Sequence, residues 1–115
     1  MKNWTLRFRQ VDKKNFEEVR SGLKSTETRA ATIKYRPIEV GNTLTFVCGN
    51  DRIVKKITAK YHWPNIDAMV KEIPFKQIMP SVDSVEEMKK AYASYPGYTE
   101  KIKEYGLLGF KLEGI

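Results

Sequence analysis

Four short stretches of the chain carry the hydrophobic pattern of β-strands. In the first and last stretches apolar residues alternate with polar ones, and they are Trp4, Leu6 and Phe8, and Leu108, Phe110 and Leu112. Residues 43–48 and 53–61 are rich in β-branched side chains, and only the four residues GNDR separate them. A connection this short joins antiparallel strands. We therefore expect a hairpin that places Phe46 and Ile57 in one core.

Four other segments have helical spacing of their apolar residues. The first follows Asp12, which is placed to cap it, and ends at Gly22. The others cover residues 65–73, 84–95 and 98–105. Ser84 and Glu87 form the capping-box pattern at the start of the third. Residues 74–80, bounded by prolines, are expected to form a short irregular turn of helix.

The order of these segments predicts an α+β fold, a small and mostly antiparallel β-barrel with helices packed at its ends. The chain has 115 residues, of which 41% are hydrophobic and 30% are charged. That composition suits a single domain over residues 1–115. No apolar run reaches the length of a membrane helix, and the first ten residues lack a signal-peptide core. We expect a cytoplasmic protein without a membrane partner, in which the one cysteine, Cys48, is buried and reduced.

The segment SGLKSTETRAAT, residues 21–32, has no apolar face on either a helix or a strand period. On a strand Glu27 and Arg29 share one face, so the guanidinium can hold the carboxylate ionised. Lys24 precedes them and can bend toward the same side. Such a set can form a site, in which the carboxylate accepts from the amine of a nucleobase and the cations bind phosphate or a developing oxyanion. The alternative is a solvated edge with a surface ion pair.

The spacing of Gly22, Lys24, Glu27 and Arg29 resembles the signature G-x-K-x-x-E-x-R of the ASCH domain. The later strand start VGNTLTF and the tail YPGYTEKIKEYGLLGFKL are also similar to that family, so the resemblance covers about the whole chain. Asn42 stands where the family often has aspartate. The resemblance implies a PUA-like β-barrel with a cleft beside the polar segment, and PUA relatives bind RNA.

Some ASCH-like proteins are hydrolases, and the resemblance to them is less complete. One branch looks like an amidohydrolase that removes the acetyl group from acetylated cytidine, and a ribonuclease activity has been attributed to another member. The amidohydrolase branch has a threonine nucleophile at the position of Glu27, and Thr26 and Thr28 would point away from that side of a strand. Asp83 is the only candidate for its further acid.

The segment KYHWP offers a second candidate surface. Tyr61, His62 and Trp63 combine aromatic rings with the sole histidine, next to Lys60, and such sets can stack on single-stranded bases. The alternative is that Tyr61 and Trp63 fill the mouth of the barrel. One histidine without clustered ligands predicts no metal site, and we expect no cofactor.

The net charge of +7 favours a polyanionic partner, although many small proteins are lysine-rich without one. The sequence therefore predicts an RNA- or nucleotide-binding domain whose candidate ligand-binding residues are Lys24, Ser25, Thr26, Glu27, Arg29, Tyr61, His62 and Trp63. A small hydrolase is the alternative, with Lys24 stabilising negative charge and Glu27 acting as general base. A protein-interaction domain is the third possibility, and the sequence leaves the oligomeric state open.

Overall fold

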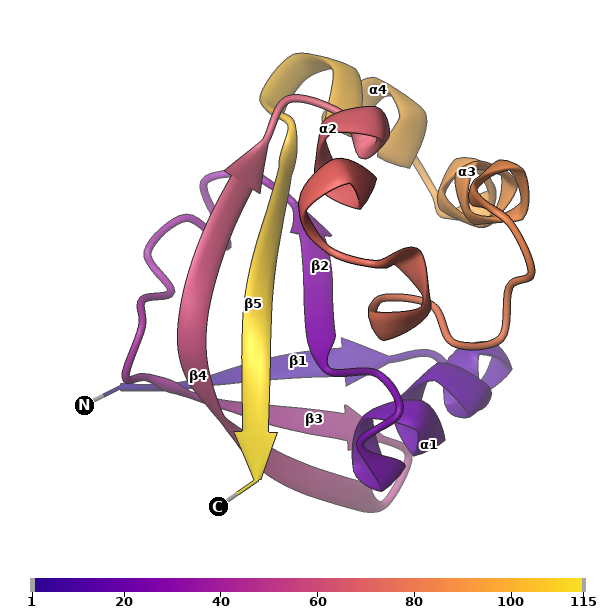
Figure 1. The fold of residues 1–115 in the computed structure, drawn as a ribbon. Coiled ribbons are helices and arrows are strands. Elements are labelled where there is room, and N and C mark those ends of the chain that lie inside the picture. Colours follow the sequence, from indigo (N-terminus) through magenta and orange to yellow (C-terminus); the bar gives the residue numbers. More distant parts are fainter. Residues whose placement is uncertain (1, 115) are drawn as a thin grey trace.

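The computed structural model describes residues 2–114 (Figure 1). Met1 and Ile115 lie outside this range. They are the two ends of the predicted domain, and Ile115 also ends its last predicted strand. The described strands are β1 (Asn3–Phe8), β2 (Thr26–Ala30), β3 (Thr43–Cys48), β4 (Asp51–Trp63) and β5 (Leu107–Gly114). The α-helices are α1 (Lys13–Ser21), α2 (Ile66–Glu72), α3 (Val85–Ser94) and α4 (Tyr98–Tyr105), with 3₁₀ turns η1 (Gln10–Asp12) and η2 (Phe75–Gln77).

The five strands form one curled sheet in the order β1-β3-β4-β5-β2. β3 with β4, β4 with β5, and β5 with β2 are antiparallel, whereas β1 and β3 are parallel. The α+β class and the mostly antiparallel, barrel-like sheet are therefore confirmed. The sheet is a half-barrel, since β1 and β2 stand at its two ends and each is hydrogen-bonded to only one neighbour among the described strands.

The predicted hairpin is present, with Thr43–Cys48 paired to residues 51–56. Its loop is shorter than expected, because Asp51 and Arg52 already belong to β4 and only Gly49 and Asn50 remain. Gly49 has φ of 60°, the value that the first position of a type II′ turn requires. The rest of the long strand β4 pairs with β5, so this one strand links the two halves of the sheet.

The helix ends agree with the sequence except at Asp12. Gly22 ends α1 in the left-handed region with φ of 85°, and Ser84 Oγ accepts from the Glu87 backbone N–H at 3.2 Å at the start of α3. The Asp12 side chain makes no cap hydrogen bond. Its carboxylate instead accepts from Arg9 Nε at 2.8 Å, because the 3₁₀ turn before α1 brings the two side chains together.

Two hydrophobic clusters hold the fold. The first lies inside the curl of the sheet against α1 and includes Phe16, Phe46 and Ile57, as predicted for the hairpin. The second packs α2, α3 and α4 together at the end of the sheet where β4 finishes and β5 begins (Figure 1). Trp63 belongs to this second cluster, and it fits because Gly109 has no side chain: a Cβ there would lie 2.5 Å from the indole ring.

Candidate functional site

A pocket of about 250 Å³ opens where the end of β1, the edge strand β2 and the α3–α4 corner meet. It is lined by Arg7, Phe8, Arg9, Asp12, Asn15, Lys24, Glu27, Thr28, Arg29, Met79, Tyr92, Tyr95, Pro96 and Tyr98. β2 is an edge strand, and within residues 2–114 it is paired only with β5. The pocket is lined by residues from both faces of this strand. Thr28 therefore lines the same pocket as Glu27, although the two alternate along β2.

Three charged side chains of the polar segment converge on Glu27. Lys24 Nζ lies 2.9 Å from Glu27 Oε1, and Arg29 Nη2 lies 3.1 Å from Glu27 Oε2. The exposed fractions of the three side chains are 9% for Lys24, 2% for Glu27 and 16% for Arg29. Residues 24–32 of the segment without an apolar face are therefore buried or half-buried, whereas residues 21–23 are exposed. The interpretation of the charged residues as a solvated edge is wrong.

The local backbone explains how Lys24 reaches its partner. Lys24 precedes β2, and its N–H donates to the Glu18 carbonyl at 3.0 Å. Ser25 N–H donates to Gln77 O at 3.0 Å, and Ser25 O accepts from Leu112 N–H at 2.8 Å. These bonds fix the chain just before the strand, so Lys24 does not follow strand alternation and turns toward the carboxylate.

Both oxygens of the Glu27 carboxylate are fully engaged within the protein. Oε1 accepts from Lys24 and from the Thr28 backbone N–H at 3.2 Å. Oε2 accepts from Arg29 Nε at 3.3 Å and from Arg29 Nη2 at 3.1 Å. A carboxylate offers about four acceptor positions, and here all four have a donor. Burial by itself raises the pKa of Glu27, but Lys24 and Arg29 outweigh it and hold the pKa below its ordinary value.

Arg29 is held in place from several sides. Its guanidinium lies 5.6 Å from the ring centre of Phe8 and 5.6 Å from that of Tyr35, both within cation–π range. Burial lowers the pKa of Arg29, and the adjacent Glu27 carboxylate more than compensates, so the net shift is upward. The guanidinium is thus a fixed positive charge in the wall of the pocket.

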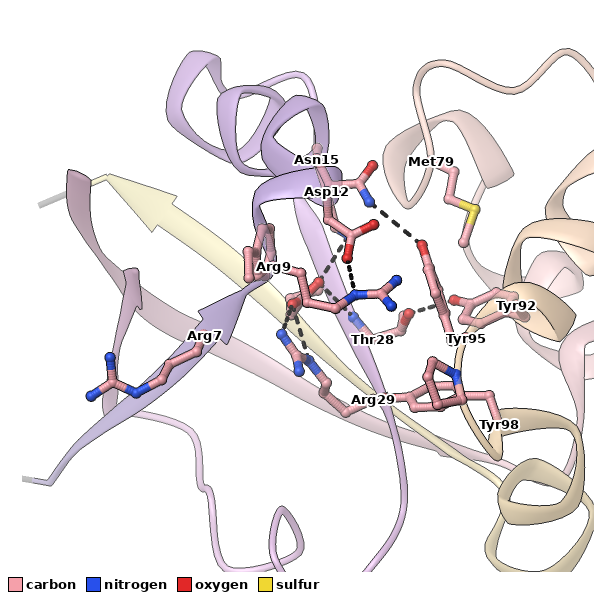
Figure 2. A pocket seen from close by; sticks show the side chains of 14 residues that line it. Arg7, Arg9, Asp12, Asn15, Thr28, Arg29, Met79, Tyr92, Tyr95 and Tyr98 are labelled. Atoms are coloured by element: carbon pink, nitrogen blue, oxygen red, sulfur yellow. Dashed lines mark hydrogen bonds and ion pairs between the residues drawn. The ribbon is translucent and has the colours of Figure 1, made fainter. Parts of the chain in front are cut away.

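Three tyrosines form the opposite wall (Figure 2). The Tyr92 and Thr28 hydroxyls are hydrogen-bonded to each other, which ties α3 to β2. The rings of Tyr95 and Tyr98 meet edge to face, with centres 5.6 Å apart. Burial raises the pKa of all three phenols, so they stay neutral at ordinary pH. Tyr92 is buried, whereas Tyr95 and Tyr98 are half-buried and present ring surface to the pocket.

The rim carries further polar groups from β1, η1 and α1. Arg9 is 53% exposed and donates to Asp12, and Asn15 Nδ2 donates to the Tyr95 hydroxyl at 3.5 Å. Figure 2 shows the Arg9 guanidinium beside Asp12, between β1 and Tyr95, whereas the Arg7 guanidinium points away from the other labelled residues. Arg9 is therefore the rim cation that can move onto a ligand.

The remaining residues predicted from the sequence lie outside this pocket. Ser25 and Thr26 flank it but do not line it. His62 and Trp63 line a separate shallow groove with Tyr105, where His62 Nε2 is 3.0 Å from Tyr105 O. Tyr61 stacks on Trp63 with ring centres 5.2 Å apart.

Asp83, the one candidate for a further acid, is 87% exposed and lies 3.6 Å from Lys76, and it does not line the pocket. Within residues 2–114 no three His, Cys, Asp or Glu side chains cluster as a metal site would require. No helix in the same range is both long and apolar enough to cross a lipid bilayer.

Sequence reasoning missed most of the pocket beyond β2. Asp12 was expected to cap a helix, and neither Arg9 nor Asn15 was marked as a site residue by any pattern in the sequence. Tyr92, Tyr95 and Tyr98 lie on either side of the Pro96-Gly97 break in the sequence, and that spacing does not distinguish a core face from a pocket wall. Only the contact between α3 and β2, 64 residues apart in the chain at Thr28 and Tyr92, makes that distinction.

Two solved structures resemble this fold over almost their full length. The crystal structure of hypothetical protein PH0355 matches with a TM-score of 0.85 and 24% sequence identity, covering 98% of this chain and 99% of that one. The solution NMR structure of protein PF0455 from Pyrococcus furiosus matches with a TM-score of 0.76 and 22% identity, covering 96% of each chain. No protein-family model and no curated protein matches this chain. At these identities the likeness establishes the shared fold of the three proteins.

Proposed function

We propose that this protein binds RNA or nucleotides, and that one nucleotide of a single-stranded segment occupies the pocket beside β2. The observation that carries the proposal is the buried Lys24–Glu27–Arg29 set, which faces the half-buried rings of Tyr95 and Tyr98 across the pocket. Cations beside aromatic rings are the combination that binds a phosphate and stacks a base.

The size and charge of the protein support the same partner. Small-molecule sites span roughly 300–1,000 Å³, and the pocket of about 250 Å³ stands just below that range, which suits a single small ligand such as one nucleotide. A base inside a duplex cannot enter such a pocket without leaving its stack. The net charge of +7 supplies attraction to a polyanion that does not depend on sequence. The resemblance of the G-x-K-x-x-E-x-R segment to the ASCH domain favours RNA in particular.

Glu27 acts in this proposal by positioning the two cations. Its four acceptor positions are taken by Lys24, Arg29 and the Thr28 backbone, so it has no further position for the amine of a base. What the set offers a ligand is therefore N–H donors. Two donors remain on Lys24 and three on Arg29 after their bonds to Glu27.

The same geometry favours a binding protein over a hydrolase. A general base works best with a pKa near the operating pH, whereas the two cations depress the pKa of Glu27 and burial fails to offset them. A carboxylate of that kind is a weak base at neutral pH. The account therefore predicts no turnover of acetylated cytidine and no cleavage of an RNA ladder by the wild-type protein, and either activity would contradict it.

The test is a titration of a single-stranded RNA oligonucleotide with wild type, Lys24→Met and Lys90→Met. Lys90 is exposed on α3 and makes a matched control, since both variants lose one positive charge. Wild-type affinity should fall with salt, with a log–log slope near −0.7 per neutralised phosphate. Lys24→Met should weaken binding about tenfold or more, as expected for a charged hydrogen bond, and Lys90→Met should change it little. Equal losses in both variants would contradict a role for the pocket.

A further inference from the structure

We infer that the group seated against Lys24 and Arg29 is a phosphomonoester, the terminal phosphate of an RNA end or of a free nucleotide, and not an internal phosphodiester. The inference rests on the proposed function and names the ligand of the same pocket. It follows from three properties of the pocket: its surplus of donors, its depth and its volume.

The first property is the surplus of hydrogen-bond donors in the pocket wall. Within residues 2–114, Glu27 is the only hydrogen-bond partner of the Lys24 ammonium and of the Arg29 guanidinium. The five N–H groups left over on these two side chains therefore have no protein acceptor. Arg9 adds further donors at the rim, because only its Nε is bonded to Asp12. A wall of this kind is complementary to a group that only accepts hydrogen bonds. A phosphate fits, whereas the edge of a nucleobase mixes donors with acceptors.

The number of acceptors separates the two kinds of phosphate. A phosphomonoester has three terminal oxygens and carries a charge of about −1.5 to −2 at pH 7. An internal phosphodiester has two such oxygens and one charge. Four cations line the pocket, Arg7, Arg9, Lys24 and Arg29. Its two carboxylates, Asp12 and Glu27, are already paired with Arg9 and with Lys24 and Arg29. The monoester matches more of the donors and more of the charge.

Depth and volume give the same answer. The Lys24 side chain is 9% exposed and the Glu27 carboxylate that pairs with it is 2% exposed. The Lys24 ammonium therefore lies at the inner wall of the pocket. An internal phosphate could reach that wall only if the nucleotides on both sides of it followed. A pocket of about 250 Å³ lies below the usual range of small-molecule sites, so it favours one terminal nucleotide over a strand that enters and leaves. A chain end needs only one way in, past Arg9 and the rings of Tyr95 and Tyr98.

The protonation of the ligand gives a readout that a phosphodiester cannot produce. The second pKa of a phosphomonoester is about 6, so its charge falls between pH 7 and pH 5. The charged and titratable groups around the site are Arg7, Arg9, Asp12, Lys24, Glu27, Arg29, Tyr92, Tyr95 and Tyr98. None of them is a histidine. Carboxyl groups and phenols ordinarily titrate near 4 and 10, and the shifts at Glu27 and the tyrosines move them further from this window.

The experiment compares one internally labelled, single-stranded RNA sequence in three forms, with a 5′-phosphate, with a 3′-phosphate, and with hydroxyls at both ends. One phosphorylated form should bind about tenfold or more tightly than the hydroxyl form. That preference should shrink as the pH falls from 7 to 5. A nucleoside monophosphate should compete where the nucleoside does not. Competition as strong as that of the phosphorylated oligonucleotide identifies free nucleotides as the source, and weaker competition identifies RNA ends.

Two variants locate the effect. Lys24→Met should abolish the preference. Arg9→Ala should reduce it without endangering the fold, since Arg9 is 53% exposed, and Arg52→Ala on the exposed side of β4 is its control. Equal binding of the three forms at pH 7, with affinity still lost in Lys24→Met, overturns this inference and leaves the proposed function standing. Failure of all three forms to bind at low salt overturns the proposed function itself.

Discussion

Lys24 lies outside β2, two residues before the strand begins, yet its ammonium is 2.9 Å from the carboxylate of Glu27 inside it. With Arg29 on the other oxygen, the carboxylate joins two cations in one buried set. An ion pair that loses water gains little stability over a well-packed apolar core. Because the set fixes two hydrogen-bond donors beside a pocket, a role in ligand binding explains it better than a contribution to stability.

The first prediction concerns the fold without the Glu27 charge. Glu27→Gln leaves Lys24 and Arg29 buried without a counter-ion, and removing one partner of a buried pair costs about 3–5 kcal/mol. Urea denaturation of both proteins at neutral pH measures the loss in unfolding free energy. Glu39→Gln is the control, because Glu39 pairs with Lys60 at 3.1 Å but is 64% exposed, and it should cost about 0–1 kcal/mol. Similar losses in the two variants would contradict a buried set.

The second prediction concerns pH. The folded-state pKa of Glu27 lies below its ordinary value of 4.5, so the folded protein binds fewer protons there than the unfolded chain. The stability that the Glu27 charge contributes is therefore fully present above about pH 4.5 and is lost as the pH falls through the folded pKa. The difference in unfolding free energy between wild type and Glu27→Gln should shrink from pH 7 toward pH 3. A difference that stays constant over this range would contradict the assignment.

The third prediction concerns the contact between α3 and β2. A double-mutant cycle with Thr28→Val and Tyr92→Phe should give a coupling energy of about 1 kcal/mol, the usual net value of a hydrogen bond. Chemical denaturation of the four proteins measures it. Tyr105→Phe, at a half-exposed ring, serves as the control and should change stability by less than about 0.5 kcal/mol. A coupling near zero would mean that the two hydroxyls act independently.

The fourth prediction concerns the hairpin core. Phe46 is fully buried, so Phe46→Ala should lower the unfolding free energy by about 3–5 kcal/mol. Val40→Ala, at a loop residue that is 54% exposed, should cost less than about 0.5 kcal/mol. Denaturation curves with equal slopes would show that the variants differ in stability and not in the surface exposed on unfolding. A loss for Phe46→Ala as small as that for Val40→Ala would contradict a buried Phe46.

Local patterns predicted the elements well, because strand alternation, glycine ends and capping boxes depend on residues close together in the chain. The hairpin of β3 and β4, the Gly22 end of α1 and the Ser84 cap all follow from such patterns. The parallel pairing of β1 with β3 does not, since Leu6 meets Phe46 across forty residues and nothing local marks their direction.

For the same reason, only one wall of the site could be predicted from the sequence. The spacing of Lys24, Glu27 and Arg29 identified one wall, although not its burial, because a polar segment ordinarily lies in water. The opposite wall comes from Tyr95 and Tyr98, which reach β2 only through the packing of α3 and α4. For Trp63 the sequence left two alternatives, base stacking and filling the mouth of the barrel, and Gly109 on a neighbouring strand decides that it is core.

The most direct test of the pocket is an NMR titration of isotope-labelled protein with a single-stranded RNA oligonucleotide. The account predicts that the largest shift changes fall on the backbone of Glu27, Thr28 and Arg29 and on the rings of Tyr95 and Tyr98, and that they weaken in Lys24→Met. Chemical-shift changes confined to His62 and Tyr105, with the signals of β2 unchanged, would contradict the account.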